Sequence, residues 1–114
     1  MRVDSYSFGS MAVDGKTYEA DLIVFPDRVR ANWWRLQGHS LAPEDLKEVV
    51  DFQPELLIVG KGAQGCMDVP AATVKALEEK HIRVINANTD KACQLFNQEL
   101  QKGKKVVAAF HLTC

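Results

Sequence analysis

The sequence has no large excess of positive or negative charge, no long apolar run and few cysteines. Lysine and arginine number 14 against 15 aspartates and glutamates, so the net charge is −1. A non-specific nucleic-acid-binding protein would be basic, and a disordered acidic segment would be strongly negative. No apolar run approaches the roughly 20 residues that a membrane-spanning helix needs. We therefore expect neither a nucleic-acid partner nor a membrane span.

Only three cysteines are present, and no two of them form a C-x-x-C pair. An odd and sparse set suits a reducing compartment and disfavours both a disulfide framework and a zinc site. The first residues, Met1-Arg2-Val3-Asp4, contain no apolar signal segment. We expect a cytoplasmic protein with no metal and no cofactor.

What the sequence does contain is the composition of one globular domain. Apolar residues make up 46% of the 114 residues and charged residues 25%, both ordinary values. A chain of this length buries roughly two thirds of its unfolded surface, enough for a core without disulfides or metal. We expect a single domain over residues 1–114, with no linker or repeat.

The first third of the chain indicates antiparallel strands. Residues 6–13, 16–25 and 28–34 are rich in strand-forming residues. Asp14-Gly15 separates the first two segments and favours a two-residue hairpin, because both central positions of that turn need positive φ. Pro26-Asp27 predicts a turn before the third segment. Together these features predict an antiparallel meander.

The remainder of the chain alternates helical and strand patterns. Strands are predicted over residues 55–60, 82–87 and 106–111, and helices from Pro43 to about Phe52, from Pro70, and from Asn88 or Thr89 to Gly103. Strands joined by helical crossovers are usually parallel neighbours. The predicted class is therefore α/β, a mixed sheet with parallel core strands and an attached antiparallel N-terminal meander.

The carboxyl ends of the predicted parallel strands are the expected position of a site. In open α/β sheets, ligands bind beyond these ends. Glycines let a backbone approach a ligand closely, and helix N-termini offer free N–H groups to an anion. The candidate ligand-binding residues are Gly60, Lys61, Gly62, Asn88, Thr89 and His111.

The segment Gly60–Gly65 has the G-x-G-x-x-G spacing of a dinucleotide-binding turn. Such a site needs a helix that begins within the motif and an acidic residue near the end of the next strand. Pro70 places the helix too late, and Ala87-Asn88 is not acidic. Two interpretations stay open, a plain glycine-rich turn and a loose anion site built on Lys61 and backbone N–H groups.

Two further groups of residues suggest chemistry or contacts. His111 and Cys114 could form a thiolate nucleophile, or they could simply end a strand and pack, since no third orienting residue is identifiable. Adjacent strand residues face opposite sides, so one of Trp33 and Trp34 is expected in the core. The other is a candidate interface residue, although both could pack within the domain.

A wider set of residues resembles one family in its order and spacing. The set comprises Phe8-Gly9, Met11, Val13, Gly15, Tyr18, Trp34-Arg35, His39, Glu48-Val49-Val50, Val59-Gly60-Lys61-Gly62, Val69-Pro70, Thr89, Phe96-Asn97 and Phe110-His111-Leu112-Thr113-Cys114. It resembles the small Mth-domain family of unknown activity, which includes the adipogenesis-associated Mth-domain protein and a mitochondrial respiratory complex I assembly factor. The resemblance implies three layers around a mixed sheet, and it implies no catalytic residues.

The expected function rests on the absence of a catalytic constellation and on the resemblance to this family. No complete catalytic constellation is present, and some members of the family act through partners. We expect a non-enzymatic binding or assembly-type module with a protein partner. The alternative is a protein or enzyme that binds a small anionic metabolite at the carboxyl ends of the parallel strands.

Overall fold

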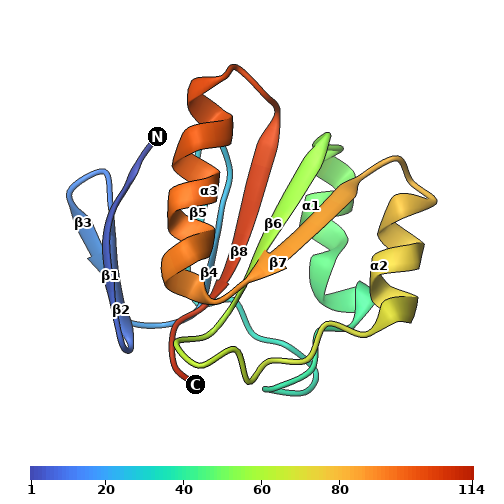
Figure 1. Ribbon diagram of the computed structural model, residues 1–114, viewed down its shortest axis with the longest axis horizontal. Coiled ribbons are helices and arrows are strands. Elements are labelled where there is room, and N and C mark those ends of the chain that lie inside the picture. The colour runs from blue at the N-terminus through green and yellow to red at the C-terminus, as the bar shows by residue number, and fades with distance from the viewer.

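The largest element of the computed structural model, which describes all 114 residues, is a five-stranded mixed sheet (Figure 1). Its strand order is β5-β4-β8-β6-β7. The strands are β4 (Leu22–Val24), β5 (Val29–Arg30), β6 (Leu56–Lys61), β7 (Arg83–Ala87) and β8 (Val106–His111). β6 runs parallel to both β7 and β8, whereas β4 runs antiparallel to β5 and β8. The prediction of three adjacent parallel strands is confirmed.

The first three strands form a separate antiparallel sheet in the order β1-β2-β3. They are β1 (Val3–Ser7), β2 (Ser10–Val13) and β3 (Lys16–Tyr18). Asp14 and Gly15 have φ values of 49° and 80°, the two positive angles that the predicted tight turn requires. The hairpin prediction is confirmed.

The strands predicted for the first third of the chain are too long. Residues 6–13 contain a turn at Phe8-Gly9, where Gly9 has a φ of 77°, so they belong to two strands. Residues 16–25 leave the first sheet after Tyr18 and enter the five-stranded sheet at Leu22. Of residues 28–34, only Val29–Arg30 pair as a strand, because Asn32 adopts a φ of 53° that extended pairing cannot accommodate.

Helices cover both faces of the five-stranded sheet. They are the 3₁₀ turn η1 (Pro43–Leu46), α1 (Lys47–Phe52), α2 (Ala71–Glu78) and α3 (Thr89–Gln101). α3 and the small sheet β1–β3 lie side by side on one face, while α1 and α2 lie on the other (Figure 1). The result is the expected three-layer arrangement. None of the helices has the length and apolar character needed to cross a membrane.

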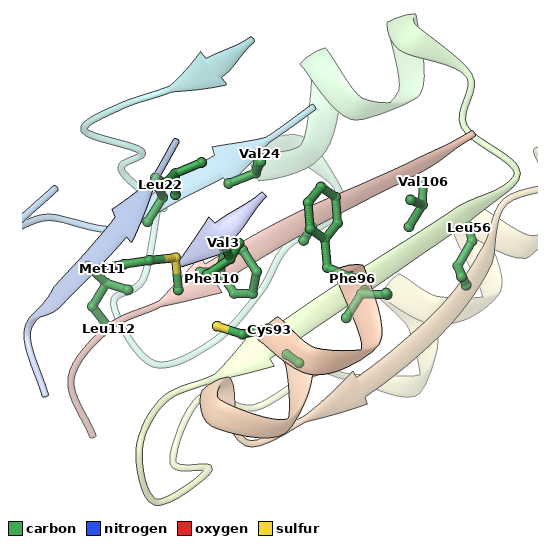
Figure 2. Close-up of a cluster of buried hydrophobic side chains, with 14 residues drawn as sticks. Val3, Met11, Leu22, Val24, Leu56, Cys93, Phe96, Val106, Phe110 and Leu112 are labelled. Atoms are coloured by element: carbon green, nitrogen blue, oxygen red, sulfur yellow. The ribbon is translucent and has the colours of Figure 1, made fainter. Parts of the chain in front are cut away.

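Each face of the sheet has its own hydrophobic core. All six residues of β8 are buried, and its apolar side chains alternate between the two cores, as expected of a strand covered on both faces. On the α3 side, Phe96 meets Phe110 edge to face at 6.4 Å, and Met11 and Val3 reach the same cluster from the small sheet (Figure 2). This packing holds α3 in place. It therefore also fixes the position of the α3 N-terminus at one edge of the sheet.

Candidate functional site

The three parallel strands end at one edge of the sheet. Lys61 pairs with His111 across β6 and β8, and Gly60 pairs with Ala87 across β6 and β7. The connecting loops and the C-terminal segment gather at this edge in Figure 1. All six candidate ligand-binding residues therefore lie at the same end of the sheet. Their ability to bind a ligand depends on which of their polar groups are free.

The loop after β6 packs against the protein's own C-terminal segment. The Ala63 N–H donates to the Thr113 carbonyl at 2.7 Å, and the Cys66 N–H donates to the Cys114 carbonyl at 2.8 Å. Gly62 has a φ of 103°, and a Cβ there would collide with the Cys114 carbonyl group. The glycine thus permits close approach to backbone of the same chain, and the N–H groups of residues 63 and 66 are already used.

Thr89 joins the ends of these strands through its side chain. It is fully buried, donates to the His111 carbonyl at 2.6 Å and accepts the Gly62 N–H at 2.9 Å. Its hydroxyl is therefore satisfied within the protein. Among the predicted residues, Lys61 is half-buried and has no ion-pair partner, and Asn88 is exposed at the start of α3.

A buried polar cluster lies at this edge, and no sequence pattern indicates it. Asp21 Oδ2 lies 2.7 Å from Arg35 Nη2 and 2.8 Å from His111 Nδ1, and Asp21 Oδ1 accepts the Leu112 N–H at 2.8 Å. The exposed fractions of the Asp21, Arg35 and His111 side chains are 16%, 5% and 6% respectively. We call these three residues the buried triad. It connects the start of β4, the loop over residues 31–42 and the end of β8.

The charge of Asp21 follows from these contacts. Burial alone would raise the pKa of Asp21, but the hydrogen bonds from His111, the Leu112 N–H and Arg35 together hold that pKa below its ordinary value. A carboxylate only accepts hydrogen bonds, so we place the imidazole proton on Nδ1 of His111. Nε2 is then the free acceptor, and it faces Thr113 Oγ1 at 3.5 Å.

An aspartate that orients a histidine resembles two members of a hydrolytic triad, but no nucleophile lies within hydrogen-bond distance of this histidine. The Thr113 hydroxyl lies beyond ordinary hydrogen-bond reach of His111. Arg35 already pairs with Asp21, so the carboxylate has less charge available to stabilise an imidazolium. The geometry favours a clamp that holds three segments together.

The clamp fixes the loop that carries the two tryptophans. Arg35 donates from Nε and Nη2 to the Gly38 carbonyl at 3.1 and 2.8 Å, and its guanidinium lies over the Trp33 ring at 4.8 Å. Trp33 is 6% exposed and donates from Nε1 to the Asp45 carbonyl at 3.0 Å. Trp34 is 83% exposed. The expected division of one core and one surface tryptophan is confirmed, and the interface role of Trp34 stays a prediction.

Trp34 lines two clefts. A cleft of about 240 Å³ is bounded by residues 19–21, 32–35 and Leu112-Thr113. A larger one of about 610 Å³ lies between residues 30–36 and the η1–α1 segment. The other exposed large apolar side chains are Leu36, at the larger cleft, and Phe8, whose neighbour Gly9 donates to the Leu112 carbonyl. The exposed apolar surface therefore borders the same edge of the sheet.

The three cysteines are separate from the buried triad. Cys93 is buried in the α3 core, Cys66 is exposed and Cys114 is half-buried. The polar side chains that contact His111 belong to Asp21, Arg35, Thr113 and His39, whose ring centroid lies 5.5 Å from that of His111. No three metal-ligating side chains lie together.

Comparison with known proteins identifies relatives over nearly the whole chain. The family model described as protein of unknown function (DUF498/DUF598) matches residues 3–111. The crystal structure of the conserved hypothetical protein PH1505 from Pyrococcus horikoshii OT3 is 27% identical, covers 100% of both chains and has a TM-score of 0.82. The structure named MT938 is 24% identical over 99% of this chain and 98% of that one, with a TM-score of 0.81.

A further solved structure carries the fold name. It is a Bordetella pertussis protein described as a Mth938-like domain, which is 18% identical over 97% of this chain and 85% of that one, with a TM-score of 0.69. At such identities MT938 and the Bordetella pertussis protein support the fold alone, whereas the match over residues 3–111 establishes the family. The chain therefore belongs to the DUF498/DUF598 family of unknown function, and it shares the fold of Mth938-like domains.

Proposed function

We propose that this protein is a non-enzymatic protein-binding module whose contact surface is centred on Trp34. The observation that carries the proposal is the 83% exposure of Trp34, which lines two clefts. Large aromatic side chains dominate binding energy when a partner buries them. A tryptophan this exposed leaves most of its apolar area available for a partner.

The loop around Trp34 is held in place before any partner binds. Arg35 is clamped by Asp21 and by the Gly38 carbonyl. On the other side of Trp34, the Leu36 N–H donates to Asp45 Oδ1 at 3.0 Å. A preorganised loop loses little conformational entropy on binding, which favours affinity. The buried triad therefore supports an interface more directly than it supports a reaction.

The clefts indicate the chemistry of the partner. The smaller one, at about 240 Å³, has room for one large apolar side chain. Four acidic side chains line the larger cleft, and two of them are paired within the protein, Glu48 with Arg30 and Asp51 with Lys47. The carboxylates of Glu44 and Asp45 have no ion-pair partner. We expect a protein segment with an apolar anchor residue followed by basic residues.

The test compares Trp34→Ser with a matched surface variant, Lys80→Ser, which lies before β7 at the opposite end of the sheet. The wild-type protein and both variants are immobilised, and proteins retained from the native source are identified by mass spectrometry. We expect at least one partner bound by the wild type and by Lys80→Ser but lost with Trp34→Ser. With that partner purified, Kd should weaken by about 30-fold or more.

Retention of every partner by Trp34→Ser would refute the proposal. Circular dichroism of the variants excludes the trivial explanation that the fold was lost. Trp34 is solvated and packs little, so we expect its replacement to change the free energy of unfolding by less than about 0.5 kcal/mol.

Lys61 supports a second candidate function, the binding of a small anion at the strand ends. Its ammonium has no ion-pair partner, and its backbone lies at the same strand ends as the other candidate residues, which are Gly60, Gly62, Asn88, Thr89 and His111. The test is a thermal-shift series with inorganic phosphate and small carboxylates, on the wild type and on Lys61→Met. A saturable shift that Lys61→Met weakens by about 1–2 kcal/mol would support this candidate. No shift with any anion would exclude it.

We also propose a cytoplasmic location. It is supported by three cysteines that are all unpaired, as expected in a reducing compartment.

A further inference from the structure

Two cysteines far apart in the sequence are brought together by the loop after β6. The Cys66 N–H donates to the Cys114 carbonyl at 2.8 Å, and the Ala63 N–H donates to the neighbouring Thr113 carbonyl at 2.7 Å. Gly62 packs directly on the Cys114 backbone, where no side chain would fit. Residues 62–66 therefore hold the backbone of Cys114 at several points.

The hydrogen bond sets the distance between the two residues. With standard bond lengths, a residue whose N–H donates to another residue's carbonyl has its Cα atom roughly 5–6 Å from the partner's Cα. Disulfides usually join Cα atoms that are about 4.4–6.8 Å apart. The backbone thus places the Cα atoms of Cys66 and Cys114 within the range that a disulfide spans.

The two thiols are also accessible, in contrast to the third. Cys66 is exposed and Cys114 is half-buried. Cys93 lies in the α3 core, where burial, followed by the nearby Asp90 carboxylate, raises the pKa of its thiol to about 12. The thiolate is the reactive form of cysteine, so Cys93 is protected from oxidation both by burial and by its protonation.

We propose that Cys66 and Cys114 are a redox pair that forms a reversible intramolecular disulfide. The oxidant is hydrogen peroxide or an organic hydroperoxide. The more exposed Cys66 thiolate attacks the peroxide, its O–O bond breaks, and Cys66 becomes a sulfenic acid while one water or alcohol leaves. The Cys114 thiolate then attacks the Cys66 sulfur, the S–O bond breaks, and a second water leaves. Two thiols are oxidised and one peroxide is reduced, and a dithiol reductant or glutathione reverses the process.

The disulfide would fasten the loop over residues 62–66 to the end of β8. Because that loop and the C-terminal segment are already hydrogen-bonded, native geometry should accommodate the bond with little rearrangement. Closing a long loop restricts the unfolded chain, so the oxidised protein should melt at a temperature higher by about 5 °C or more. This proposal is independent of any partner at Trp34.

The experiment uses the reduced full chain treated with one equivalent of hydrogen peroxide. Free thiols are counted with a maleimide reagent, and non-reduced peptides are mapped by mass spectrometry. We expect two of the three thiols to disappear, a peptide joining Cys66 to Cys114, and a free Cys93. Cys93→Ser is the matched control, and it should form the same bond. Cys66→Ser and Cys114→Ser should form no intramolecular bond.

Proximity is tested separately by equilibrating the protein with reduced and oxidised glutathione. The measured quantity is the effective concentration of the Cys66 thiol with respect to the Cys114 thiol. We expect this effective concentration to be about tenfold or more higher in native buffer than in concentrated urea. Equal values in the two solvents would overturn the proposal, because the fold would then contribute nothing. Mixed disulfides with glutathione at both sites, without an intramolecular bond, would overturn it as well.

Discussion

Removing the charge of Arg35 is the sharpest perturbation of the buried triad. Arg35→Met keeps an unbranched stem of similar length but deletes the ion pair with Asp21 at 2.7 Å and both hydrogen bonds to Gly38. Breaking a buried pair by removing one partner costs about 3–5 kcal/mol, because a charge is left uncompensated. Asp21 is 16% exposed and keeps its bonds from His111 and the Leu112 N–H. We therefore expect a loss of about 2–4 kcal/mol in the free energy of unfolding.

Urea denaturation followed by tryptophan fluorescence measures this loss, because Trp33 lies under the Arg35 guanidinium and reports on the loop. The matched comparison is the double variant Asp21→Asn with Arg35→Met, in which no lone carboxylate is buried. It should be less destabilised than the sum of the single variants, with a coupling of about 1 kcal/mol or more. A loss below about 1 kcal/mol for Arg35→Met, with additive single variants, would show that the buried triad does not hold the loop.

Three other predictions concern the hairpin, the strand ends and acid stability. Gly15→Ala should lose about 1 kcal/mol in urea denaturation, because φ is 80° there, whereas Gly38→Ala, with open space around it, should be nearly neutral. Thr89→Val should lose about 2–4 kcal/mol by leaving the Gly62 N–H and the His111 carbonyl unpaired, and Thr89→Ser should retain most of the stability. Because the folded pKa of Asp21 lies below its ordinary value of 3.8, its contribution is full above that pH and declines as the pH falls through the folded pKa. Thermal melts between about pH 6 and pH 2 should therefore show a shallower decline at the acid end for Asp21→Asn than for the wild type; an identical decline would contradict this assignment.

The central sheet could be predicted because its signals are local. Short apolar runs at residues 55–60 and 106–111 indicate strands buried on both faces, and the helices between them restrict the connections. The tight turn at Asp14-Gly15 is equally local. The prediction for residues 16–25 is wrong because strand-forming residues occur on both sides of a crossing between two sheets, and only tertiary packing decides where the chain crosses.

The buried triad could not be predicted, because its residues are far apart in the sequence. Asp21 and His111 are separated by 90 positions in the chain, and Arg35 and His111 by 76. No spacing rule connects residues of that kind. His111 is a candidate because of its place at the end of a strand, but nothing in the sequence links it to Asp21 or Arg35. The tryptophan pair is an intermediate case. One side chain is buried and one exposed, as predicted, although residues 33 and 34 lie outside any strand.

The position of the buried triad argues for a role beyond stability. An ion pair removed from water gains little net free energy, and apolar residues of similar size often serve a core equally well. Here the pair does not sit at the centre of either hydrophobic core but at the edge where β8 ends, and it fixes the residue next to Trp34. A hydrogen-bonded clamp has fixed geometry, which a flexible apolar contact lacks, so it can present an exposed tryptophan in one orientation. The costly buried charge thus lies where it makes the Trp34 loop rigid, and this supports the proposed partner-binding surface.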